Sequence, residues 1–186
     1  ASSLVLDGGS LQVTGQPTLS GVVRQLAASR IGLSAGALLA TTQAVDLGSS
    51  VLSLEGPGTF ANGQPFALDQ PGAGLELSGG VVATGALELG GGVLHAAGDA
   101  EVSGALSISA DASVQIDSQK TLTYSGPEVS IGQNILVITG AGTLSNTNAL
   151  VLGNPAGVLK LSGTNAVSGP VSLNSGTIDV DDSSAL

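Results

Sequence analysis

The chain has 186 residues, 42% of them hydrophobic, so it can bury a core, yet it contains only two Phe, one Tyr, no Trp and no Met. Its formal net charge of −10, with four Lys and Arg, argues against nucleic acid and against an anionic membrane surface as partners, and the absence of Cys excludes a disulfide framework. A globular core of this size uses aromatic residues to fill irregular volume. A narrow core of aliphatic residues with glycine corners fits this composition better.

Short apolar–x–apolar triplets run along the whole chain. Alternation with a period of two is typical of a strand with one buried face. In chain order the triplets are Leu4–Leu6, Leu11–Val13, Leu52–Leu54, Leu75–Leu77, Leu87–Leu89, Leu106–Ile108, Val114–Ile116, Leu122–Tyr124, Val129–Ile131, Ile135–Ile138, Leu150–Leu152, Leu159–Leu161, Val171–Leu173 and Ile178–Val180. These strands are shorter than those of hairpin sandwiches. The pattern therefore predicts an all-β fold, a single parallel β-helix (β-solenoid) with Gly and Asn corners.

Internal similarity supports this prediction. Residues 74–95 and 158–179 align without gaps and are identical at seven of 22 positions. With roughly 20–24 residues per coil the chain makes about eight to nine coils, a rod of roughly 40 Å. The predicted core residues are Leu75, Leu77, Leu87, Leu89, Leu159, Leu161, Val171 and Leu173. The predicted corners are Gly79, Gly85, Gly92, Gly163, Asn165, Gly169 and Gly176.

Residues 22–47 are the least regular part of the chain. The run Val22–Arg30 suits either a helical turn that bulges from the coil or a coil strand with an atypical corner. No linker divides the sequence, so we expect one domain over residues 1–186. The chain starts without a Met, a basic n-region or an apolar h-region, so we expect a processed product or a fragment of a longer protein.

Residues 158–179, the second copy of the internal repeat, have a spacing of Leu, Gly, Asn and Ile residues that resembles the autotransporter-associated β-strand repeat. The residues that carry the resemblance are Leu159, Leu161, Gly163, Asn165, Gly169, Gly176 and Ile178. The copy departs from the family pattern at Val167 and Pro170, and the first copy has Val81 in place of the asparagine. The segment Gly104–Asp111 is similar to haemagglutinin-type solenoid repeats. The resemblance implies a rod-like exported segment of a bacterial surface protein, secreted or on the cell surface.

Asparagines at corners have a physical explanation of their own. Asn165, and with it Asn146, Asn148 and Asn174, can bond their own backbone and tolerate the left-handed region. We therefore expect these residues to be structural.

Chemistry-bearing residues are sparse. His95 is the only histidine, and a catalytic role would need an oriented partner, so we expect a surface or hydrogen-bonded histidine. Polysaccharide-active β-helix enzymes use paired carboxylates, for which Asp99 with Glu101, or Asp111 with Asp117, are the candidates.

Basic residues and sugar-binding aromatics are too few to support such an enzyme. The basic residues are Arg24, Arg30, Lys120 and Lys160. We therefore expect no enzyme, and no catalytic or cofactor-binding residue is nominated.

One acidic cluster could bind a metal ion. Asp179, Asp181 and Asp182 offer the hard oxygen ligands that Ca²⁺ prefers, although no calcium-loop motif accompanies them. The alternative is a solvated segment, and no other cofactor is expected. Thr41, Thr42, Thr121 and Thr123 are not expected to recur at a coil period, which disfavours an ice-binding threonine ladder.

Two functions of different classes remain. The first is a structural or adhesive rod whose faces meet a host-cell or matrix surface, without direct membrane insertion by this segment. The second is a filament or matrix subunit that stacks on copies of itself head to tail, because uncapped coils present bare strand edges.

Overall fold

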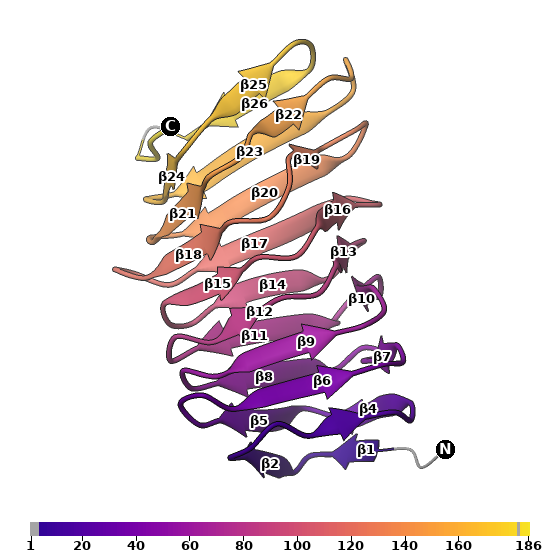
Figure 1. Ribbon diagram of the computed structural model, residues 1–186. Helices are drawn as coiled ribbons and strands as arrows, with labels where there is room; N and C mark the ends of the chain where they lie inside the picture. Colours follow the sequence, from indigo (N-terminus) through magenta and orange to yellow (C-terminus); the bar gives the residue numbers. More distant parts are fainter. Residues whose placement is uncertain (1–3, 182) are drawn as a thin grey trace.

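The computed structural model describes residues 4–181 and 183–186, and over these residues it contains strands and turns but no helix. Consecutive coils pair in parallel throughout, with three strands per coil, and the chain rises as one rod of about eight turns (Figure 1). The predicted parallel β-solenoid is therefore confirmed. Because no helix is present in the described residues, none is long and apolar enough to cross a membrane.

Three faces run along the rod. The nine-stranded sheet consists of β2 (Ser10–Val13), β5 (Ser29–Leu33), β8 (Val51–Glu55), β11 (Gly74–Ser78), β14 (Val93–Ala96), β17 (Ala112–Ile116), β20 (Ile135–Gly140), β23 (Val158–Gly163) and β26 (Thr177–Val180). The eight-stranded sheet consists of β3 (Thr18–Leu19), β6 (Leu38–Thr41), β9 (Thr59–Asn62), β12 (Val82–Ala83), β15 (Ala100–Val102), β18 (Thr121–Tyr124), β21 (Thr143–Asn146) and β24 (Ala166–Ser168).

The third face, called the split face below, is divided into three short sheets. The first contains β1 (Leu4–Asp7), β4 (Val23–Ala27) and β7 (Val45–Asp46). The second contains β10 (Phe66–Leu68), β13 (Leu87–Leu89) and β16 (Leu106–Ile108). The third contains β19 (Val129–Ser130), β22 (Leu150–Leu152) and β25 (Val171–Leu173).

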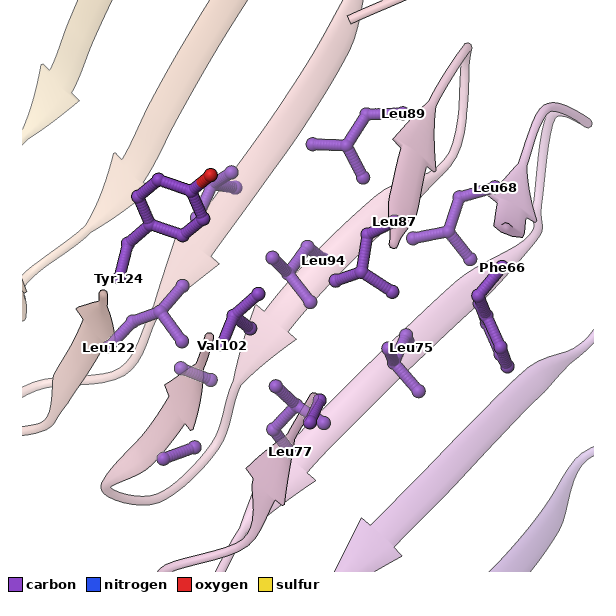
Figure 2. Packing of buried hydrophobic residues seen from close by; sticks show 14 of the residues in the cluster. Phe66, Leu68, Leu75, Leu77, Leu87, Leu89, Leu94, Val102, Leu122 and Tyr124 are labelled. Atoms are coloured by element: carbon purple, nitrogen blue, oxygen red, sulfur yellow. The ribbon is translucent and has the colours of Figure 1, made fainter. Parts of the chain in front are cut away.

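Alternate residues of each strand point into the rod, where the three faces meet in one aliphatic core. Figure 2 shows Leu75, Leu87 and Leu94 reaching this interior from different coils and faces. The two phenylalanines are both buried and pack edge to face, with ring centroids 6.0 Å apart. A narrow core filled by aliphatic residues thus accounts for the shortage of aromatics, as the composition predicts.

Register along the nine-stranded sheet keeps one inward column in line over five coils. The column consists of Leu75, Leu94, Val114, Ile138 and Leu161. The gapless alignment instead matches Leu75 with Leu159, two residues away. A shift of two residues preserves which side chains face inward, so the repeat predicts the buried face correctly although it misses the exact register.

The predicted core residues are buried with two exceptions. The buried ones are Leu75, Leu77, Leu87, Leu89, Leu159 and Leu161. Val171 is partly buried against the core, but Leu173 is 52% exposed, so its prediction as a core residue is wrong. Its neighbour one coil earlier, Leu152, is fully buried because β25 covers it. Within the described residues β25 is the last strand of its sheet, so no strand covers Leu173.

Residues 22–47 form ordinary coil strands, β4 to β7, and not a helical turn. β4 pairs with β1 and β7, and β5 pairs with β2 and β8. The side chains of Arg24 and Arg30 point outward, because alternate residues Val23 and Ile31 fill the core. Only Ala28 separates β4 from β5, which explains why the sequence lacks a clear corner here.

The break of the split face between β16 and β19 is closed by a side chain. The Leu106 N–H donates to Tyr124 Oη at 3.2 Å. An apolar cavity of about 20 Å³ lies beside this bond, bordered by Leu94, Val114 and Leu136 among others. Tyr124 therefore occupies space and satisfies a backbone donor where the strand ladder is interrupted.

Candidate functional site

The densest group of chemistry-bearing side chains lies on the outer surface of the nine-stranded sheet. Glu76 on β11, His95 on β14 and Gln115 on β17 occupy one outward row, in register over three coils. Asp117 follows directly after β17. The sequence therefore places a histidine between carboxylates of the preceding and following coils.

His95 contacts both carboxylates. Its Nε2 lies 2.9 Å from Asp117 Oδ1, and its Nδ1 lies 3.5 Å from Glu76 Oε2. Ser53 extends the row, since its hydroxyl donates to Glu76 Oε1 at 3.2 Å. The His95 side chain is 23% exposed. These contacts join successive coils, and the hydroxyl of Ser53 is directed at Glu76 rather than at the imidazole.

The two carboxylates of the first predicted catalytic pair, Asp99 and Glu101, bind separate partners. Asp99 Oδ1 accepts the Thr121 N–H at 2.9 Å, and Glu101 Oε1 accepts the Ser125 hydroxyl at 2.5 Å. Each of these bonds reaches the next coil.

The second predicted pair is divided in the same way. Asp111 Oδ1 accepts the Ile135 N–H at 2.8 Å, whereas Asp117 contacts His95. These side chains therefore connect the coils.

Three basic residues are also engaged by neighbouring coils. Arg24 pairs with Asp46 at 3.5 Å, and Arg30 pairs with Glu55 at 3.1 Å. Lys160 pairs with Asp179 at 3.4 Å. All these side chains are at least 31% exposed, so each pair contributes little stability by itself.

The candidate calcium cluster is only partly described. Asp179 binds Lys160, and the Asp181 N–H donates to Leu161 O, while Asp182 lies outside the described residues. Among the residues with described positions, no three His, Asp or Glu side chains are grouped closely enough to hold a metal ion.

The predicted corner glycines are needed for two different structural reasons. Gly79, Gly163, Gly169 and Gly176 have positive φ. Gly85 and Gly92 instead allow close approach: a Cβ on Gly92 would lie 2.6 Å from Ala73 O. Both uses exclude a larger residue.

Asn165 is buried and bonds between coils. Its side-chain nitrogen donates to Ser162 O at 2.7 Å and to Ile138 O at 2.9 Å. The predicted backbone bonding is therefore present. The left-handed conformation is not, because Gln119 is the one non-glycine residue with positive φ in the described chain.

The other three asparagines also make hydrogen bonds. Asn146 Nδ2 donates to Pro170 O at 2.9 Å, and Asn148 Nδ2 donates to Gly126 O at 2.8 Å, so both reach a neighbouring coil. Asn174 Oδ1 lies 3.5 Å from the hydroxyl of Ser172, at the exposed surface.

Sequence reasoning missed two buried amides with the same role, Asn62 and Gln25. Asn62 Nδ2 donates to Gln64 O and Ala86 O, both at 2.8 Å. Gln25 Nε2 donates to Ala27 O at 2.9 Å and also to Val51 O. A polar residue at an alternating inward position next to a corner is the signal that would have found them.

Two grooves lie on the surface of the rod, and neither is bordered by His95. One groove of about 570 Å³ is bordered by Ser10, Ser29 and Arg30. Another, of about 450 Å³, lies at the break between β7 and β10, bordered by Asp46 and Asp69. The first groove reaches Ser53 at the end of the histidine row, but neither groove is bordered by Glu76, His95 or Asp117.

The expectation about threonines is wrong at one place. Thr121 on β18 pairs in register with Thr143 on β21, and Thr123 pairs with Ser145. Hydroxyl side chains thus recur on two adjacent coils of the eight-stranded sheet, because both strands start with the pattern Thr-Leu followed by Thr or Ser.

The fold therefore defines the chain as a β-solenoid. Comparison with protein-family models, with curated proteins and with solved structures finds no match to this chain.

Proposed function

We propose that the chain is a structural rod, a segment of an exported bacterial surface protein that presents its faces and loops for adhesion. The observation that carries this proposal is which partners the polar side chains bind. Carboxylates, amides and His95 bond to the next coil, as Asp99 does to Thr121 and Asn62 does to Ala86. A catalytic or small-ligand site would instead gather such groups around a cavity.

Energetics support a rod. Burial of aliphatic side chains in one continuous stack is the main stabilising term, at about 25 cal/mol per Å² of apolar surface. Parallel hydrogen bonds between coils add directional stiffness, and each coil is stabilised by its neighbours. The nine strands of the longest sheet give the rod a length of roughly 40 Å at about 4.8 Å per strand.

The assignment to an exported surface protein rests on the resemblance of residues 159–178 to the autotransporter-associated repeat. The glycines and Asn165 of that pattern occupy corners, as a solenoid repeat requires. The absence of Cys suits export as an unbridged chain.

The test uses beads coated with the folded chain and measures their adhesion to host cells and to extracellular matrix. We expect adhesion by the native chain and by His95→Gln, and loss of adhesion for Leu77→Asp, which disrupts the core. Cleavage of a polysaccharide by the native chain, abolished in His95→Gln, would overturn the proposal. Equal adhesion of the native and Leu77→Asp chains would also count against it.

A further inference from the structure

A chemically labile pair of residues lies at the end of β9. Asn62 is the last residue of this strand and the one asparagine in the sequence that a glycine follows. Glycine has no side chain to shield its backbone nitrogen. In a flexible chain the nitrogen of Gly63 can therefore attack the side-chain carbonyl carbon of Asn62, which closes a five-membered imide and releases ammonia.

In the folded chain both reacting groups are held in hydrogen bonds. The Gly63 N–H donates to Thr41 O of the preceding coil at 2.7 Å. The Asn62 side-chain nitrogen, which is the leaving group, donates to Gln64 O and Ala86 O, both at 2.8 Å. Asn62 is only 8% exposed, so water has little access to it. The closed coil therefore resists the reaction, and an opened coil permits it.

The products of the reaction do not fit the closed coil. An aspartate at position 62 has no side-chain N–H, so one of its carboxylate oxygens would face Gln64 O and Ala86 O. The other oxygen would replace Asn62 Oδ1, which has no hydrogen-bond donor among the described residues. A buried charge without a partner is strongly destabilising. Isoaspartate, the alternative product, adds a main-chain atom at the end of β9 and disturbs its register with the neighbouring coils.

We propose that Asn62 is a modification site that reacts when its coil opens. The Gly63 nitrogen forms a bond to Asn62 Cγ, the bond from Cγ to Nδ2 breaks, and ammonia leaves with the proton that Gly63 loses. Water then opens the imide at one of its two carbonyls and yields aspartate or isoaspartate. Neither product closes the native coil again, so opening becomes irreversible once the reaction has occurred. The inference rests on the fold and is independent of the proposed adhesion.

Peptide mass spectrometry measures the reaction directly. Cleavage after Glu55 and Glu76 isolates a peptide in which Asn62 is the only asparagine. The chain is held in mildly alkaline buffer with and without guanidinium chloride, and the deamidated fraction of this peptide is followed over time. We expect the rate to be at least about 100-fold lower in the folded chain, a factor that needs an opening free energy of about 2.8 kcal/mol.

The same measurement contains a control for the attacking nitrogen. In guanidinium chloride, where folding does not matter, Gly63→Ala should slow the reaction because its methyl group hinders the attack. Equal rates at Asn62 in the folded and unfolded chains would overturn the proposal. An unfolded chain that does not react at this position would also overturn it.

Refolding tests the consequence of the modification. The chain is held unfolded at mildly alkaline pH for increasing times and diluted into buffer, and the refolded fraction is measured by circular dichroism. This fraction should fall in step with deamidation at Asn62. A chain held unfolded for the same times at mildly acidic pH, where the backbone nitrogen keeps its proton, should refold fully.

Two variants separate the effect of this position from that of deamidation in general. Asn62→Asp reproduces one product and should lower the refolded fraction and the urea midpoint. Asn174→Asp, at an exposed position, should refold as the native chain does. Complete refolding of the deamidated chain, or equal behaviour of the two variants, would contradict the proposal.

Discussion

Gly85 leaves free the space that the side chain of Asn62 occupies. A Cβ on Gly85 would lie 2.0 Å from Asn62 Oδ1, which real contacts do not allow. Asn62 belongs to β9, and Gly85 follows β12 in the next coil. The pairing recurs at Asn146 and Gly169, where a Cβ would lie 2.7 Å from Asn146 Oδ1. The buried amides of Asn62 and Asn146 thus each lie against a glycine of the next coil.

Removal of this amide should destabilise the fold. In Asn62→Ala two hydrogen bonds are lost, the one to Gln64 O and the one to Ala86 O, although Ala86 O keeps the N–H of Phe66, and each such bond contributes about 0.5–1.5 kcal/mol. We expect the free energy of unfolding in urea to fall by about 2 kcal/mol. The matched control is Asn174→Ala, which changes an exposed side chain and should alter stability by less than about 0.5 kcal/mol. Equal effects of the two variants would contradict this role of the amide.

The contact between Asn62 and Gly85 predicts non-additivity. Gly85→Ala places a methyl group in occupied space and should cost about 1–3 kcal/mol. In the double variant Asn62→Ala with Gly85→Ala the clash is removed. The loss of stability should then be smaller than the sum of the single losses, by at least about 0.5 kcal/mol. Additive losses in a urea double-mutant cycle would show that the two residues do not interact.

Tyr124 predicts a loss of stability at alkaline pH. Burial raises the pKa of Tyr124 above its ordinary value of about 10, and the hydrogen bond from Leu106 acts in the opposite direction. The folded chain thus holds the phenolic proton more tightly than the unfolded chain. The stabilisation is fully present below about pH 10 and is lost as pH rises through the folded pKa.

This prediction can be measured on one chromophore, because the chain has a single Tyr and no Trp. Tyrosinate absorbance should appear at higher pH in the folded chain than in urea. The urea midpoint of the native chain should fall over the same pH range. Tyr124→Phe should lack this fall, and a tyrosine that titrates alike in folded and unfolded chains would refute the prediction.

Two leucines at equivalent inward positions provide a matched pair for the core. Leu152 is fully buried and Leu173 is 52% exposed, although they are stacked neighbours in one sheet. We expect Leu152→Ala to cost about 2–5 kcal/mol. Leu173→Ala should cost less than about 1 kcal/mol, since half of its surface already contacts water. Urea unfolding measures both, at a protein concentration that keeps the chain monomeric.

Sequence alone predicts the nine-stranded sheet and the split face better than the eight-stranded sheet. On β9 and β21 the second inward position holds Asn62 or Asn146, so the apolar–x–apolar triplet is missing. β12 has only two residues, of which Ala83 faces inward, so it also lacks the triplet. These strands exist because hydrogen bonds to the neighbouring coils form them, and a single sequence pattern does not contain that information.

The side-chain contacts between coils could not be predicted from the sequence either. The gapless repeat gives no sign that Glu76 and Asp117 flank His95, because coils of different length decide which residues meet. One coil contains 19 residues, from Leu77 to Ala96, and another contains 24, from Ile116 to Gly140. The corners absorb this difference while the inward positions of the sheet stay aligned.

This variation in coil length has a consequence for how such a chain can change. An insertion at a corner need not displace any strand from its ladder, since coils already differ by several residues without loss of register. New binding loops can therefore be added to the rod one corner at a time, with the stacked leucines left in place. For protein engineering, the corners after β16 and β19, the two strands between which the split face is divided, are the first places to graft such loops.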